Sequence, residues 1–268
     1  MASYAEQLQT AKAAHYAVEA LDDQARNLIA QAFTDWDNGL YDAQTIRHRI
    51  EAVVRAAYRQ AASLGPGVAA RASDIPDWTP AVPFNNEYLQ SLLKDVRRNL
   101  REFKAAKGED ADKIKRKAIL NVQHSAGVGA ERGYTDAVLS AYQELADFGY
   151  IVEKYWLNNF DNGNVPCPFC RALHGKKAKL GEAFKTPQKV YLNLQGPPLH
   201  PRCHCYLAVI VRSLENALEQ VDIEEPTLAP DTMTTAQIKK IPLAIFKAVV
   251  AALGSIRKKF GKKMNYEP

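Results

Sequence analysis

The stretch Cys167-Pro-Phe-Cys170, followed later by His200-Pro-Arg-Cys203-His204-Cys205, contains all four cysteines of this 268-residue chain. A CxxC pair places two thiolates on one tight turn, and the later segment can complete a tetrahedral shell of sulfur and nitrogen donors around Zn²⁺. We therefore predict a structural zinc site in the second half of the chain, in a module whose core is too small to be secure without such a staple.

Zinc needs four ligands, and this region offers more donors than that. The candidate ligands are Cys167, Cys170, His200, Cys203 and Cys205. One possible set is the four cysteines. The other combines the CxxC pair and His200 with one of the last two cysteines; we favour it, with Cys205, because the proline after His200 fixes its approach. The competing interpretation is two disulfides or four free thiols.

The composition is that of a folded protein. Hydrophobic residues make up 47% of the chain and charged residues 24%, which excludes global disorder. The first residues lack a basic segment followed by an apolar one, so we expect synthesis in a reducing cytosol. In that compartment a cysteine cluster is more typical of a metal site than of disulfides.

The net charge of +5 is unevenly distributed. From Lys239 to the end there are eight basic residues and one acid, a balance of +7, which leaves −2 for the rest of the chain. Affinity for phosphate or anionic lipid that depends on net charge is therefore expected chiefly in this tail.

The hydrophobic pattern predicts an α+β protein with six segments. These are a helical N-terminal region at 1–65, a proline-rich linker at 66–85, a helical region with a basic face at 86–149, the zinc-stapled module at 150–212, a tether at 213–238 and a cationic amphipathic helix at 239–268.

Local signals place the elements within these segments. Asp42 or Thr45 is expected to cap a helix that ends at 65–67, where the sequence is Gly-Pro-Gly. A helix from about 130 to 148 should end at Gly149. Strand-forming residues predict strands at 150–157, 190–192 and 206–211.

Two groups of basic residues are candidates for contact with a DNA backbone. They are Arg97, Arg98, Arg101 and Lys104 on the helix that starts near 86, and Lys258, Lys259, Lys262 and Lys263 in the tail. Positioned Lys and Arg are sufficient for phosphate binding. For the first group the simpler interpretation, which we favour, is a solvated helix face partly neutralised by neighbouring acids.

The cysteine region also resembles a known family. Residues 155–161 (Tyr-Trp-Leu-Asn-Asn-Phe-Asp), the CxxC followed by Leu173 and Gly175, and the Pro-Pro-Leu-His-Pro-Arg-Cys-His-Cys run at 197–205 are similar, in order and spacing, to the phage Mu F-like head morphogenesis family. The resemblance covers about residues 130–212. One departure is His204, where the family usually has arginine.

The resemblance implies a minor capsid protein of a tailed bacteriophage, made in the host cytoplasm and located in the virion, in the head interior or at the portal vertex. Its partners would be the portal protein, the major capsid protein and packaged double-stranded DNA, and several copies per particle are expected. Its role would lie in head assembly and in DNA packaging or ejection. In that setting Asp161, Leu173 and Gly175 would be scaffold residues, with Leu173 beneath the knuckle and Gly175 at positive φ.

Two other functions compete with this interpretation. One is a zinc-ribbon nucleic-acid-binding protein without a structural role in a virion. The other is a metal-dependent nuclease or hydrolase, suggested by His174, His200 and His204 in one segment. We expect no enzyme, because the donors are numerous enough to close the zinc shell and no HExxH, GxSxG or glycine-rich phosphate loop occurs.

The apolar run at 241–253 is shorter than the roughly 20 residues that span a bilayer. We expect it to form a helix that docks into a groove on a partner such as the portal, with the lysines facing DNA. Membrane contact of this helix during DNA delivery is the alternative.

Overall fold

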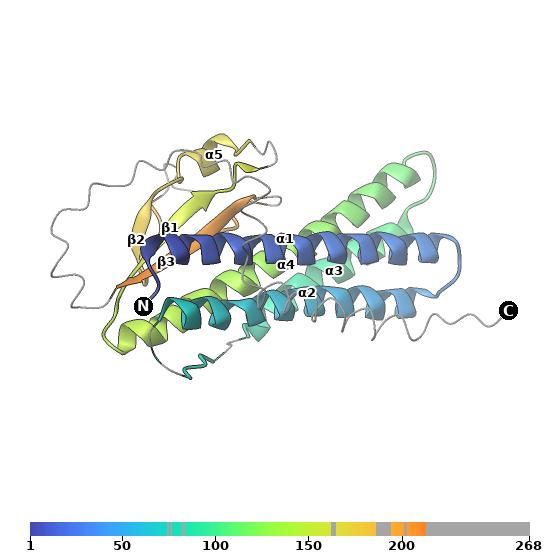
Figure 1. The fold of residues 1–268 in the computed structure, drawn as a ribbon. Coiled ribbons are helices and arrows are strands. Elements are labelled where there is room, and N and C mark those ends of the chain that lie inside the picture. The colour runs from blue at the N-terminus through green and yellow to red at the C-terminus, as the bar shows by residue number, and fades with distance from the viewer. Residues whose placement is uncertain are drawn as a thin grey trace. The chain divides into compact units, whose positions relative to one another are not determined.

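The computed structural model describes residues 1–73, 75, 77–81, 84–161, 165–185, 194–200 and 203–212. The chain divides into two compact units, Met1–Thr227 and Leu228–Pro268, and all the described residues belong to the first. Long helices form a bundle, and a small sheet lies against the first helix near one end of it (Figure 1). The predicted tether, the tail with its four lysines and the predicted strand at 190–192 lie outside the described residues.

The first two helices are α1 (Tyr4–Asp37) and α2 (Ala43–Ala72). A capping box between Ser3 and Glu6 starts α1, since each side chain satisfies the other residue's backbone amide. The side chain of Asp42 accepts a hydrogen bond from the Thr45 amide at the start of α2, so the prediction of Asp42 as the cap is confirmed.

The predicted end of the second helix at 65–67 is wrong, because α2 continues to Ala72 with Pro66 inside it. Proline removes one helical hydrogen bond and usually breaks a helix. Here tertiary packing outweighs that cost. A Cβ on Gly65 would lie 2.7 Å from the backbone nitrogen of Val138, so only glycine permits this contact, and the residues of the last turns, Val68, Ala69 and Ala72, are buried.

The other two long helices are α3 (Asn86–Ala105) and α4 (Ala111–Asp147). The apolar face predicted for the first of them is confirmed by the burial of Leu89, Leu92, Leu93, Val96, Leu100 and Phe103.

The fourth helix starts well before the predicted position near 130. Glycines and polar residues interrupt its apolar period, yet Gly133 lets α4 approach α2, since a Cβ there would lie 2.6 Å from the Tyr58 carbonyl oxygen. Gly149, at φ 93°, follows the end of α4 as predicted.

Three antiparallel strands form the sheet in the order β2-β1-β3. They are β1 (Ile151–Asn158), β2 (Lys177–Lys179) and β3 (Cys205–Arg212). The strands predicted at 150–157 and 206–211 are confirmed, and the α+β class with them. The three-residue strand β2 and the short helix α5 (Pro168–Arg171) carry too little pattern to be predicted.

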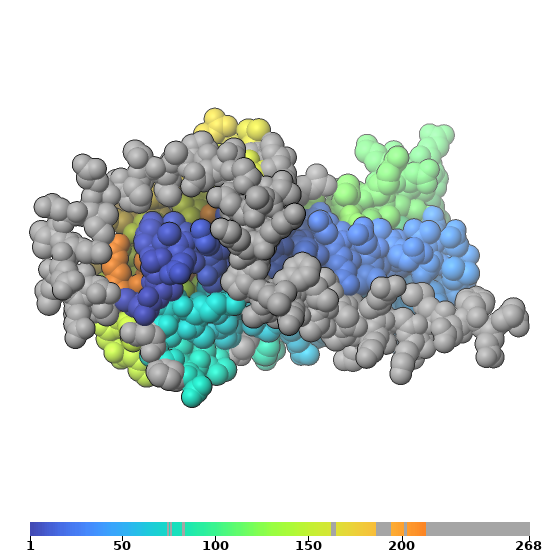
Figure 2. Space-filling view, viewed as in Figure 1, coloured from blue at the N-terminus to red at the C-terminus, as the bar shows by residue number. Residues whose placement is uncertain are grey.

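The sheet packs on the first half of α1, and Figure 2 shows the surface of β3 next to that helix. Ala11 of α1 joins Leu157, Tyr206 and Ala208 in one buried cluster. The buried side chain of Gln7 forms two hydrogen bonds with the backbone of Val211, at 2.8 and 3.1 Å. The small sheet is therefore fastened to the bundle through α1. Within the part of the chain that the structure describes, no helix has the length and apolarity to cross a bilayer.

Candidate metal centre

The CxxC segment begins with a capping interaction. Cys167 is the N-cap of α5, Pro168 follows at the first helical position, and the Cys170 amide donates to the Cys167 sulfur at 3.4 Å. Proline is favoured at this position because its missing N–H would have no helical partner. The short helical turn therefore brings both sulfurs to one side.

His200 reaches the same point from a distant part of the chain. Its Nε2 lies 3.1 Å from the Cys167 sulfur and 3.2 Å from the Cys170 sulfur. The segment that carries it is held by two hydrogen bonds. The Thr135 hydroxyl donates to the Pro197 carbonyl at 2.8 Å, and the Lys154 ammonium donates to the Gln195 side-chain oxygen at 2.6 Å. His200 is therefore positioned by both α4 and β1.

The last two cysteines complete the cluster at the start of β3. The sulfurs of Cys170 and Cys203 are 3.7 Å apart. The donors fall into two groups, each with its ligand atoms within 4.8 Å of one another: Cys167, Cys170 and His200, and Cys170, Cys203 and Cys205. Cys170 belongs to both. All five predicted ligands thus meet in one cluster that could hold a metal ion, and the four cysteines are free thiols, not disulfides.

The distances favour Cys203 over Cys205 as the fourth donor. Two thiolates bound to one ion at about 2.3 Å in a tetrahedral shell are about 3.8 Å apart, close to the Cys170–Cys203 separation of 3.7 Å. The Cys205 sulfur belongs to the second donor group but also lies within hydrogen-bonding distance of the Asn158 side-chain oxygen, at 3.2 Å. The sequence favoured Cys205, but it gave no sign that the side chain of Asn158 lies beside the Cys205 sulfur.

The pKa values of the four thiols are shifted in opposite directions. Hydrogen bonds from Cys170 and Cys205 lower the pKa of Cys203, and the hydrogen bonds to Cys203 raise the pKa values of Cys170 and Cys205. Burial raises the pKa of Cys167, but hydrogen bonds from the Cys170 amide and from neighbouring side chains, His200 among them, outweigh it and lower the value. The cluster therefore favours one thiolate at Cys203 and prepares a second at Cys167, and thiolates are the form that binds metal.

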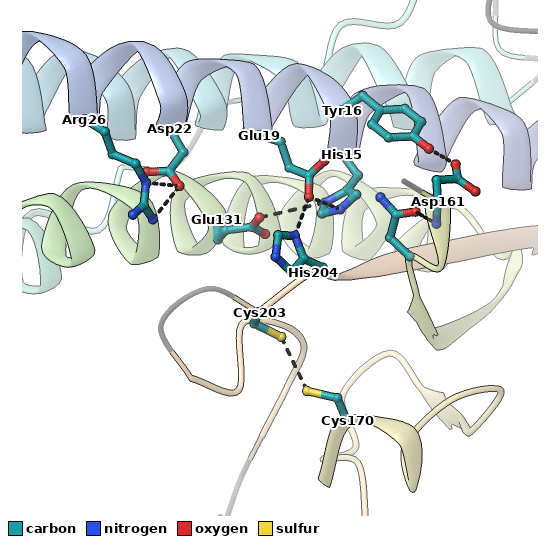
Figure 3. Close-up of polar contacts among 11 residues, drawn as sticks. His15, Tyr16, Glu19, Asp22, Arg26, Glu131, Asp161, Cys170, Cys203 and His204 are labelled. Atoms are coloured by element: carbon teal, nitrogen blue, oxygen red, sulfur yellow. Dashed lines mark hydrogen bonds and ion pairs between the residues drawn. The ribbon is translucent and has the colours of Figure 1, made fainter. Parts of the chain in front are cut away.

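The other two histidines of the segment lie outside the metal groups. Nδ1 of His174 accepts a hydrogen bond from the Asn158 amide at 3.0 Å, and burial lowers the pKa of this histidine. Nδ1 of His204 lies 3.0 Å from Oε1 of Glu19 on α1 (Figure 3). The three histidines that suggested a nuclease therefore do not converge on one point, and Glu19 is a contact that the sequence gave no reason to expect.

The remaining motif residues lie in the core near the cluster or connect this region to α1. Leu173 is buried, at 1% exposure, and Gly175 has φ 74°, as expected for both, and Trp156 is fully buried. Asp161 pairs with Lys12 of α1 at 2.9 Å and also accepts the Tyr16 hydroxyl. The aspartate of the motif therefore links the segment after β1 to α1, and Figure 3 shows its contact with Tyr16 near the Glu19–His204 pair.

A pocket of about 400 Å³ opens next to the cluster, between α1, α4 and the segment that holds His200 and Cys203. Four carboxylates line it, from Glu19, Asp22, Asp23 and Glu131. Burial raises the pKa of Glu131, and the negative charges of Cys203 and Glu19 add to that effect. Arg26 and His204 also line the pocket and pair with Asp22 and Glu19, so His200 and Cys203 face a pocket of charged side chains of both signs.

Of the residues predicted to contact DNA, the first group of four lies along α3, and the four lysines of the tail lie outside the described residues. Arg97 is occupied by Glu51 of α2, at 2.7 Å, and Arg98 by Asp95, at 3.0 Å. Arg101 and Lys104 are exposed. Part of the basic face is thus neutralised within the protein, as the simpler interpretation expected.

Comparison with known proteins found no match among family models, curated proteins or solved structures.

Proposed function

We propose that this protein is a minor capsid or head morphogenesis protein of a tailed phage, a structural component near the portal that assists head assembly and DNA packaging or ejection. The cysteine cluster acts in it as a structural Zn²⁺ site. The proposal rests on the resemblance of residues 155–205 to the Mu F-like family, whose motif residues are spread along fifty positions of the sequence.

The observation that carries the proposal is the convergence of those residues. Cys170 belongs both to the group with Cys167 and His200 and to the group with Cys203 and Cys205, although the CxxC pair and the later residues lie about thirty positions apart. A mixed set of three sulfurs and one imidazole nitrogen is typical of closed structural zinc sites. Such a site contributes folding energy, because the unfolded chain cannot assemble it.

The structural role follows from what the site connects. It joins α5, the 194–200 segment and the start of β3, next to the contacts that fasten this region to α1. When bound, zinc would supply charge neutralisation for the thiolates and fix these three segments. The cluster residues thus serve as a staple for a surface that partners such as the portal and the capsid can recognise.

The test of the function is association with particles. Virions of the phage that encodes this chain should contain the protein in low copy number after density-gradient purification and nuclease treatment. The C170A variant, which loses a ligand shared by both donor groups, should be depleted from particles. Normal particles that lack the wild-type protein would reject the virion role, and binding of free duplex DNA as its sole activity would favour the zinc-ribbon alternative.

A further inference from the structure

Three arginines converge on one carboxylate between α2 and α3. Glu51 accepts hydrogen bonds from Arg47 at 2.9 Å, Arg55 at 3.1 Å and Arg97 at 2.7 Å. The Glu51 side chain is only 7% exposed, whereas the three arginine side chains are between 32% and 48% exposed. The carboxylate is thus the buried anchor, and the guanidinium groups extend from it toward solvent.

The cluster has more positive charge than its anchor can neutralise. Three guanidinium groups and one carboxylate leave a local charge of +2. Burial would raise the pKa of Glu51, but hydrogen bonds from Arg97 and Arg47 outweigh it and lower the pKa to about 2, so the carboxylate stays ionised at neutral pH. Each arginine has five N–H donors and uses only one or two here, so donors remain for a further anion.

Because of the way α2 and α3 pack, further basic residues of α3 continue this cluster as a row. The Asn85 amide before α3 donates to the Tyr58 hydroxyl of α2, while Arg97 reaches back to Glu51, so α2 and α3 are antiparallel. Arg101 therefore lies level with Arg47, one turn beyond the Arg97–Glu51 pair. Eight residues separate Arg47 from Arg55, which at a rise of about 1.5 Å per residue gives a row about 12 Å long.

We propose that this row, formed by Arg47, Arg55, Arg97 and Arg101 with Lys104 at its end, is a binding surface for the phosphate backbone of duplex DNA. A B-DNA strand carries one phosphate per about 3.4 Å of axis, so the row matches about three or four phosphates. Guanidinium groups fixed by a carboxylate lose little side-chain freedom on binding, and their planar donors suit phosphate oxygens. The contact is with the backbone, so it carries no sequence preference.

This inference deepens the proposed function and rests on it for its setting, because packaged DNA is the duplex that a protein inside the head meets. The two can fail separately. Absence from virions would reject the proposed function and leave DNA binding by the purified chain unaffected. An inert α2–α3 surface would reject the inference and leave virion association intact.

The test is a salt titration of binding to a 30-base-pair duplex by fluorescence anisotropy, with the full chain. The R101A/K104A pair removes two exposed cations for which the described part of the chain shows no ion pair. The R47A/R55A pair removes two arginines of the cluster. The K177A/K179A pair on β2 is the matched control, because it removes the same charge from a different surface. Each is measured with the native tail and again with K258A/K259A/K262A/K263A, which removes most of the tail's charge.

Each α2–α3 double variant should lower the slope of log affinity against log salt by about 1.8, since each phosphate contact contributes about 0.9. The affinity lost between 50 and 200 mM salt then becomes about tenfold smaller. The control should leave the slope unchanged. Equal slopes for wild type and R101A/K104A would overturn the proposal, as would equal losses from the control. Loss of binding to polyglutamate without any change in DNA binding would assign the surface to an acidic protein and likewise overturn it.

Discussion

His204 lies between two cysteines of the metal centre, yet its Nδ1 faces Oε1 of Glu19 on α1, 3.0 Å away. The carboxylate of Glu19 is also 3.2 Å from Nε2 of His15, which stacks on Tyr206 of β3. The histidine inside the motif therefore holds the cysteine-bearing strand to the first helix and contributes no ligand to either metal group. Its backbone carbonyl also accepts from the Asn159 amide, at 2.9 Å.

Replacing His204 with arginine should preserve this contact and remove its pH dependence. The Glu19 hydrogen bond raises the pKa of His204 above 6.5, so the ion pair is fully present below that value and is lost as pH rises through the raised pKa. Arginine stays charged throughout. We expect H204R and wild type to have similar melting temperatures at pH 6. At pH 8.5 the melting temperature of H204R should be about 1–2 °C above that of the wild type, a small difference because the ion pair is partly exposed to solvent.

Thermal unfolding at four pH values checks this, with H204A as the control that has no pair at any pH. Zinc content should be the same in all three proteins. A loss of bound metal in H204A would contradict the assignment of His204 as a residue that positions the strand.

Cysteine substitutions should show that Cys203 is a zinc ligand and that Cys205 is not. C203A should lose bound zinc, because its sulfur lies at the tetrahedral edge distance from Cys170. C205S should keep one zinc per chain, since serine still donates to Asn158. Metal analysis after gel filtration is the measurement. The reverse result, with zinc kept by C203A and lost by C205S, would restore the set favoured from the sequence.

Removal of the metal should affect one part of the fold more than the rest. Chelation by EDTA should lower amide protection in α5 and β3, because the site joins those segments, and in β1, because it pairs with β3. The helices α2 and α4 should stay protected by the contacts between them. Hydrogen exchange followed by mass spectrometry resolves these segments. Uniform loss of protection, or none in the sheet, would contradict a staple local to this region.

Glycine substitutions test the packing of α2 on α4. G133A would place its Cβ 2.6 Å from the Tyr58 carbonyl oxygen, a backbone atom that cannot turn aside, and should destabilise the protein by about 1–3 kcal/mol. G67A is the matched control within α2. Its nearest atom is the end of the Arg71 side chain at 3.6 Å, so alanine should be neutral or stabilise the helix by about 0.5–1 kcal/mol. Urea unfolding measures both, and a tolerated G133A would reject the close approach.

The sequence predicted those features whose signal is local. The caps, the apolar face of α3 and the strands β1 and β3 depend on residues within a few positions of one another, and they agree with the structure. The continuation of α2 through Pro66 could not be predicted, because the stabilising partner of Gly65 is the backbone of α4, seventy residues away. The start of α4 was missed for a related reason: its small residues serve contact with other helices and interrupt the apolar period.

The same distinction applies to the site. The spacing of the cysteines and of His200 predicted the five residues that form the two candidate donor groups, since metal ligation restricts residue type and spacing together. The contacts around the donors come from ordinary residues at distant positions. Glu19 on α1 and Lys154 on β1, which is fully buried and bound to Gln195, belong to no motif, so only the fold reveals their part in holding the cluster.

The most direct test of the account is the metal content of the purified full chain, measured by inductively coupled plasma mass spectrometry together with its thermal stability. The account predicts one zinc per chain, none in C170A, and a lower melting temperature for the wild type after chelation. A monomeric, folded chain that contains no zinc and melts at the same temperature with and without EDTA would contradict the metal staple on which the proposed function depends.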